Sequence, residues 1–151
     1  MAPVLFGYDG SEHARAAIDR AGHLLRPGPA VVVTVWSTLA GAAPSAMLAL
    51  PGGVVAEAVS DIDAATREAA EAMAAEGAAL AVAAGFEARP HVVRRSGAFF
   101  SALIACADEL DAAAIVLGSR GRSALAATLL GSVSTGVLHH TTRPVLIARA
   151  G

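Results

Sequence analysis

Apolar and polar positions along the chain predict strands and helices in alternation. Short apolar runs, most of them rich in β-branched residues, predict strands over residues 4–8, 30–36, 112–118 and 144–149. An alternation of period two predicts a further strand over residues 86–94. Apolar residues recur at helical spacing over residues 11–25, 61–84 and 98–110, and a further helix is expected to begin at Ser132. Because strand and helix alternate throughout, we expect an α/β fold in which helices cover both faces of a parallel sheet.

The segment between the second strand and the second helix has a different pattern. Residues 37–59 are small, interrupted by proline and uncharged until Glu57, which indicates a long connection. A loop of that length in a compact domain is usually a lid, one edge of a site or partly disordered. Proline and glycine also divide the uncharged residues 27–56 into pieces shorter than the ~20 apolar residues of a membrane span. We therefore expect no membrane segment.

Length and composition narrow the possible functions. The 151 residues predict one domain, over residues 1–151. A formal net charge of −2 provides no basic surface for nucleic acid or an anionic membrane. Every Lys or Arg position is arginine, which excludes a lysine-dependent phosphate loop or Schiff base. The single Cys106 cannot form an intrachain disulfide, and the start lacks the basic region of a signal peptide, so we expect a cytoplasmic location.

The most informative stretch for chemistry follows the fourth strand. Two residues separate Gly118 from Gly121, and nine separate Gly121 from Gly131, which is joined directly to Ser132. Glycine removes the side chains that would keep a ligand away from backbone N–H groups, and serine is typical of a helix start. Such a loop and helix start bind anions, phosphates above all. We expect a bulky residue at Gly118 or Gly121 to abolish binding and to leave the fold largely intact.

The spacing Gly-x2-Gly-x9-Gly-Ser resembles the nucleotide-binding signature of the universal stress protein family, in its ATP-binding branch. Residues 4–12 resemble the opening of that family and residues 134–149 its closing helix and strand. The resemblance implies one open five-stranded sheet of order 3-2-1-4-5, Rossmann-like and similar to the adenine nucleotide α-hydrolases. Ligands of such sheets bind where the strand order reverses, here between the strands that end at Tyr8 and Leu117. Residues 95–99 depart from the Gly-Asp-Pro of many relatives.

The resemblance and the residue chemistry together predict an adenine-nucleotide site. The carboxylate of Asp9 can accept hydrogen bonds from ribose or adenine, or help to hold Mg²⁺ on phosphates; the alternative is a turn and helix cap. Val35 matches a valine whose backbone contacts adenine in the family, and its alternative is a plain core position. Arg120 can neutralise phosphate charge or stay solvated. The predicted site residues are Gly7, Tyr8, Asp9, Val35, Leu117, Gly118, Arg120, Gly121, Gly131, Ser132, Val133 and Ser134.

The function implied by the resemblance is that of a stress-response regulator or sensor that binds ATP, AMP or cyclic AMP. No catalytic set is evident, because the five histidines lack metal-ligand spacing and neither a nucleophile elbow nor a dinucleotide fingerprint is present. Two alternatives stay open: an ATP-hydrolysing enzyme that relies on Asp9, Mg²⁺ and Arg120, and a structural dimer without nucleotide. The apolar last strand, at an edge of the sheet, predicts a homodimer centred on Val145, Leu146 and Ile147.

Overall fold

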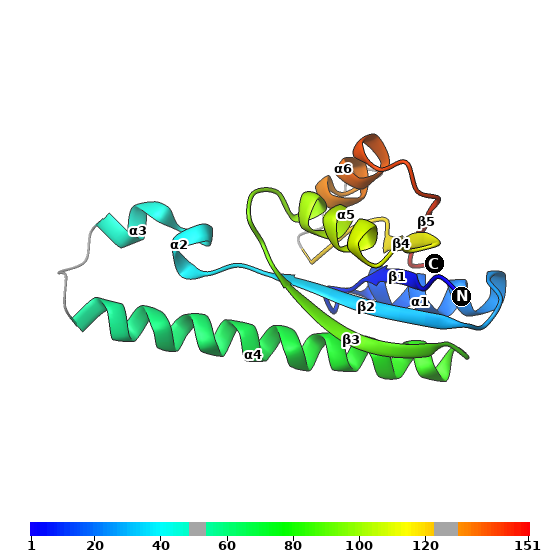
Figure 1. Cartoon of the computed structure of the whole chain (residues 1–151), viewed down its shortest axis with the longest axis horizontal. Helices are drawn as coiled ribbons and strands as arrows, with labels where there is room; N and C mark the ends of the chain where they lie inside the picture. The colour runs from blue at the N-terminus through cyan, green and yellow to red at the C-terminus, as the bar shows by residue number, and fades with distance from the viewer. Residues whose placement is uncertain (49–53, 123–129) are drawn as a thin grey trace.

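A parallel sheet forms the centre of the computed structural model, which describes residues 1–48, 54–122 and 130–151. Its strands lie in the order β3-β2-β1-β4-β5 (Figure 1), which confirms the predicted α/β fold and strand order. Every predicted strand end falls within two residues of the observed one. The strands are β1 (Val4–Gly7), β2 (Pro29–Trp36), β3 (Glu87–Arg94), β4 (Ala114–Gly118) and β5 (Val145–Ala148).

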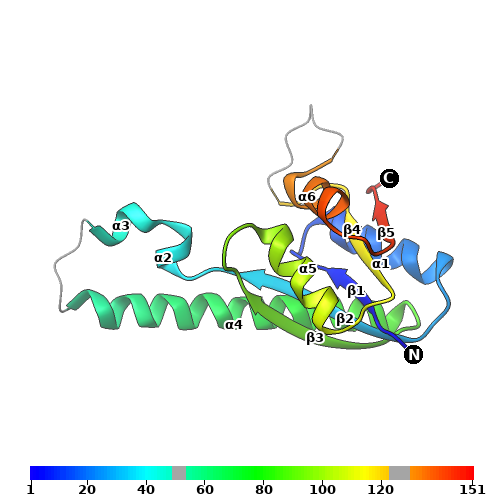
Figure 2. The ribbon, with the colours of Figure 1, turned by 45° about the horizontal axis from the view of Figure 1, so that its top comes forward.

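Helices cover both faces of this sheet (Figure 2). One face packs against α1 (Glu12–Leu24) and α4 (Val54–Ala83), and the other against α5 (Phe99–Glu109) and α6 (Ser132–His140). Successive strand residues point to opposite faces, so each face has its own apolar core: Phe6, Val32 and Val116 lie on the side of α1 and α4, and Leu5, Val31 and Ile115 on the side of α5 and α6. Burial on both faces explains why β1, β2 and β4 are almost continuously apolar.

The prediction of one long connection over residues 37–59 is wrong in two respects. Two short helices, α2 (Leu39–Ala42) and α3 (Pro44–Leu48), form within it, and α4 begins at Val54 instead of Asp61. The side chain of Thr38 caps α2 by accepting a hydrogen bond from the N–H of Gly41 (3.1 Å), and Asp63 of α4 accepts one from the N–H of Leu39 (2.7 Å). The small uncharged residues gave no polar face from which helical spacing could be recognised. Residues 49–53 lie outside the described chain.

Helix α4 contains 30 residues, a length of about 45 Å at the usual rise per residue. Its C-terminal part covers β2 and β3, and its N-terminal part extends past the sheet beside α2 (Figure 1). A Cβ on Gly77 would lie 2.7 Å from a Val32 methyl carbon and 2.8 Å from the Tyr8 ring. Glycine there lets the helix lie close to the sheet. Neither α4 nor any other described helix has an apolar stretch long enough to cross a membrane.

Candidate functional site

The predicted site residues come together at the end of β1 and β4, where the strand order reverses. β1 pairs with β2 on one side and with β4 on the other, and a cavity of about 1120 Å³ opens beyond their carboxyl ends. The lining includes every residue predicted from the sequence: Gly7, Tyr8, Asp9, Val35, Leu117, Gly118, Arg120, Gly121, Gly131, Ser132, Val133 and Ser134. Their roles in binding stay a prediction.

Asp9 caps a turn and also faces the glycine loop. Its Oδ1 accepts a hydrogen bond from the N–H of Ser11 (3.0 Å), and Ser11 in turn caps α1 by accepting from the N–H of Ala14 (3.1 Å). The other carboxylate oxygen, Oδ2, lies 2.9 Å from the position that a Cβ on Gly121 would occupy. The turn-and-cap role weighed for Asp9 is therefore real, and it leaves Oδ2 directed at the loop.

Gly118 is required by packing within the protein itself. A Cβ at this position would lie 2.6 Å from the carbonyl carbon of His13 and 2.8 Å from the backbone nitrogen of Ala14. These atoms belong to the first turn of α1 and cannot move aside as a flexible side chain can. The expectation that a bulky residue at Gly118 leaves the fold intact is therefore wrong, because this glycine lets α1 lie directly on the end of β4.

Gly131 differs from Gly118, because its own packing in the described chain leaves room for a side chain. A Cβ there would have its nearest contact at 3.5 Å, to the Cα of Arg120, an ordinary van der Waals distance. Its φ of −73° and ψ of 167° suit any residue. A glycine without a packing reason fits a need for close approach by a ligand. Residues 123–129, which separate Gly121 from Gly131, lie outside the described part of the chain.

The first turn of α6 presents its backbone to the cavity. Gly131 is the N-cap of this helix, and no side chain among the described residues makes a cap hydrogen bond there. The first N–H groups of a helix lack partners within the helix, and together with the helix dipole they attract anions. The hydroxyl of Ser134, expected to add a donor to the site, instead donates to the carbonyl of Gly118 (2.8 Å). The hydrogen-bonding groups that this turn offers are mainly backbone N–H groups.

A second wall of the cavity was not predicted from the sequence. Its residues come from the end of β2 and from the faces of α4, α5 and α6: Thr34, Trp36, Ser37, Thr66, Ala69, Ala70, Met73, Phe99, Leu103, Thr135, Gly136, His139 and His140. Helical spacing already placed Ala69 and Met73 on the inner face of a helix, but only the packing of that helix on the sheet shows that this face reaches the cavity. Arg122 also lines it, beside Arg120.

The segment that departs from the family pattern has its own contacts. The guanidinium of Arg95 lies 4.6 Å from the ring centre of Phe99, the first residue of α5. The same side chain donates a hydrogen bond to the carbonyl of Gly41 in α2 (2.9 Å). Because Phe99 lines the cavity, Arg95 connects α2 to this wall by an interaction in which a cation stacks on an aromatic ring.

Tyr8 connects the floor of the cavity to α4. Its hydroxyl donates to Oε1 of Glu76 (2.6 Å), which also accepts from Nη2 of Arg15 (2.7 Å). Burial, followed by the hydrogen bond to Glu76, raises the pKa of Tyr8 to about 12. The hydrogen bonds from Tyr8 and then Arg15 lower the pKa of Glu76. This group of side chains joins β1, α1 and α4 beside the cavity.

This arrangement gives a titration that can be checked directly, because Tyr8 is the only tyrosine in the chain. We expect the ultraviolet absorbance of phenolate to appear with a midpoint near pH 12. The raised pKa favours the neutral phenol in the folded state, so its stabilising contribution is present below pH 10 and is lost as the pH rises through about 12. In Glu76→Ala the midpoint should fall but stay above 10, because burial still acts. A wild-type midpoint near 10 would contradict the geometry.

Known proteins share the sequence pattern and the architecture of this chain. The family model described as "Universal stress protein family" matches residues 1–149. A universal stress protein from Archaeoglobus fulgidus is 24% identical, with a TM-score of 0.69 and coverage of 98% of this chain and 98% of that chain. A universal stress protein in complex with cAMP is 29% identical, with a TM-score of 0.58 and coverage of 99% of this chain and 97% of that one.

A third structure, the universal stress protein from Archaeoglobus fulgidus in complex with dAMP, is 23% identical, with a TM-score of 0.62 and coverage of 98% of each chain. No curated protein sequence matches the chain. The family model spans nearly the whole sequence, and the strand order is the one that the resemblance implied. The chain therefore belongs to the universal stress protein family.

Proposed function

We propose that the cavity binds an adenine nucleotide, with ATP as the main candidate and AMP or cyclic AMP as smaller ones. The observation that carries this proposal is the first turn of α6, which presents backbone N–H groups beside Gly121 and Gly131 in a cavity of about 1120 Å³; no side chain among the described residues caps this turn. Support also comes from the universal stress proteins in complex with cAMP and with dAMP. A protein that holds a nucleotide without an evident catalytic set is suited to act as a stress-response regulator or sensor. We propose that it does so as a single domain in the cytoplasm.

The lining suits the parts of such a ligand. Phosphates would meet the N–H groups at the start of α6 and the positive charges of Arg120 and Arg122. Adenine would lie against apolar groups near Val35 and Met73, and the carboxylate of Asp9 would accept hydrogen bonds from ribose. Within the described ranges, no three His, Cys, Asp or Glu side chains are grouped to hold a metal ion. Any Mg²⁺ would therefore be held mainly by the phosphates, with Asp9 as the nearest carboxylate candidate.

Isothermal titration of ATP into nucleotide-stripped protein tests this function. We expect saturable binding of ATP at one site per chain, weaker binding of GTP, and competition by AMP and cyclic AMP. Chromatography of the nucleotide after a long incubation with stoichiometric protein separates the two readings of the site: intact ATP supports a sensor, and conversion to ADP supports the ATP-hydrolysing alternative. An absence of binding by all three adenine nucleotides would refute the proposal and leave the structural dimer.

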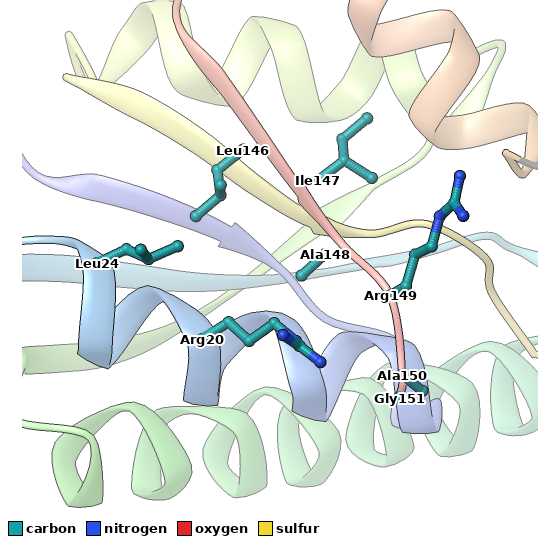
Figure 3. Close-up of a pocket in the computed structure, with 8 residues that line it drawn as sticks. All are labelled: Arg20, Leu24, Leu146, Ile147, Ala148, Arg149, Ala150 and Gly151. Atoms are coloured by element: carbon teal, nitrogen blue, oxygen red, sulfur yellow. The ribbon is translucent and has the colours of Figure 1, made fainter.

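We also propose a homodimer through β5, because the two edges of the sheet differ. β3 has Pro90 in mid-strand and exposed charged residues on either side of it, features that protect an edge from pairing. β5 has half-buried Val145, Leu146 and Ile147 and no such protection. Figure 3 shows Leu146 and Ile147 pointing to opposite sides of β5, beside a cavity of about 390 Å³ that Leu24 of α1 also lines. A second copy paired at β5 would cover this edge.

Ile147→Asp is expected to make the protein monomeric, because a carboxylate would be buried at the centre of the proposed interface. Light scattering at micromolar concentration should give a mass near 15.0 kDa for this variant and twice that for the wild type. Val82→Asp, on an exposed position of α4, is the matched control and should stay dimeric. A monomeric wild type, or a dimer that Ile147→Asp does not weaken, would rule out this interface.

A further inference from the structure

Ser119 follows the first glycine of the loop and is held from three directions. Its N–H donates to the carbonyl of Ala148 in β5 (2.7 Å), and its carbonyl accepts from the N–H of Gly131, the N-cap of α6 (2.7 Å). Its hydroxyl lies 3.2 Å from Nδ1 of His13, in the first turn of α1. The side chain is only 1% exposed. Ser119 therefore joins the last strand, the first helix and the start of the helix that faces the cavity.

His13 continues this set of contacts. Its Nδ1 also accepts a hydrogen bond from the N–H of Ala150, at 3.0 Å. A backbone N–H can only donate, so Nδ1 must be the unprotonated nitrogen and the ring proton must be on Nε2. The hydroxyl of Ser119, 3.2 Å away, can then only donate, and it shares the single lone pair of Nδ1 with the N–H of Ala150. One acceptor atom thus holds both the segment after β5 and the residue that receives the hydrogen bond from Gly131.

We propose that His13 and Ser119 are positioning residues for the phosphate-binding turn, an inference that rests on the proposed nucleotide site. Neither residue lines the cavity, so both would act through Gly131. Because no side chain in the described part of the chain caps α6, the hydrogen bond from the Gly131 N–H to the Ser119 carbonyl helps to set the position of this turn. Without an acceptor at position 13, the buried hydroxyl of Ser119 loses its partner. One of the three contacts that hold Ser119 is then gone, so its carbonyl is held less firmly against the N–H of Gly131.

If His13 and Ser119 position this turn, replacing either residue should weaken the binding of ATP, which has phosphates, more than the binding of adenosine, which has none. The start of α6 would contact phosphate, whereas adenosine would lie against Val35, Met73 and Asp9. His13→Leu should therefore weaken ATP binding about tenfold, the size expected for loss of one to two hydrogen bonds, and change adenosine binding by less than about twofold. A residue that supported only the fold would weaken both ligands alike.

His13→Asn is the matched variant, because its side-chain oxygen lies at about the distance of Nδ1 from the backbone and can accept the same hydrogen bonds. We expect it to restore most of the lost ATP affinity. Ser119→Ala removes the other side of the contact and should weaken ATP severalfold without affecting adenosine. Because Ser119→Ala removes a single oxygen atom, it also provides a readout if His13→Leu does not fold.

The experiment is a titration of ATP and adenosine into wild type, His13→Leu, His13→Asn and Ser119→Ala, with the fluorescence of Trp36 as the signal. Trp36 is the only tryptophan and it lines the cavity. An ATP-selective loss in His13→Leu and Ser119→Ala that His13→Asn largely restores supports the inference. Equal loss of both ligands, no loss, or no restoration by asparagine overturns it. A wild type that binds neither ligand refutes the proposed function itself, and this inference with it.

Discussion

Gly118→Ala is expected to lower the free energy of unfolding by about 3 kcal/mol, the upper end of the cost of overpacking. The added Cβ would lie 2.6 Å from the carbonyl carbon of His13 and 2.8 Å from the backbone nitrogen of Ala14. Relief requires α1 to move away from the end of β4, which would open the core around Ala14 and Ala17. Urea denaturation followed by Trp36 fluorescence measures the change.

Gly28→Ala is the matched control for this experiment. Among the described residues, its Cβ would come within 4 Å only of the Met1 side chain, with the sulfur atom at 2.9 Å, and that side chain is exposed and can move. We expect this variant to unfold within about 0.5 kcal/mol of the wild type, as most surface changes do. If Gly118→Ala is equally stable, α1 does not pack on β4 as described here.

The second large effect is on binding, and we expect it from Gly131→Ala. Among the described residues, none comes closer than 3.5 Å to the new Cβ, and the backbone angles suit alanine, so the fold should lose no more than about 1 kcal/mol from the poorer N-cap. The same methyl group would stand where phosphate is proposed to approach the start of α6. Hydrogen bonds to a charged phosphate lengthen or break, so ATP affinity should fall about 30-fold, or ~2 kcal/mol.

Isothermal titration and urea denaturation of the two alanine variants form one comparison. Gly118→Ala should mainly lose stability. Gly131→Ala should mainly lose ATP affinity, and its unfolding transition should stay close to that of the wild type. Normal ATP affinity in Gly131→Ala would show that this glycine is not needed for close approach. The phosphate-binding role of the loop would then have to be abandoned.

The strands β1, β2 and β4 could be predicted from the sequence because they are largely buried on both faces, so their apolar runs stand out between helices of regular spacing. The edge strand β3 carries exposed charged residues, and its alternating pattern is what indicated a strand there. Their order could not be derived from those runs, and it was implied by the family resemblance. The glycine loop and the start of α6 were recognisable because close approach to an anion demands glycine and free N–H groups at fixed spacing. These features are local in the sequence, as is the turn at Asp9.

Features that depend on packing between distant segments were not predictable. The early start of α4 and the helix α2 lie in small uncharged residues, where no polar face marks a helix. The packing reason for Gly118 depends on which helix lies over the end of β4, and the role proposed for His13 depends on contacts with Ser119 and Ala150, more than 100 residues away in sequence. Only three-dimensional contacts reveal these relations.

We propose above all that the start of α6 and the glycine loop hold the phosphates of an adenine nucleotide. The most direct measurement is a crystal structure of the protein grown with ATP. We expect phosphate oxygens within hydrogen-bond distance of the backbone N–H groups of Ser132 and Val133, with adenine beside Val35. A nucleotide bound outside this cavity, or one whose phosphates lie away from the start of α6, would contradict it.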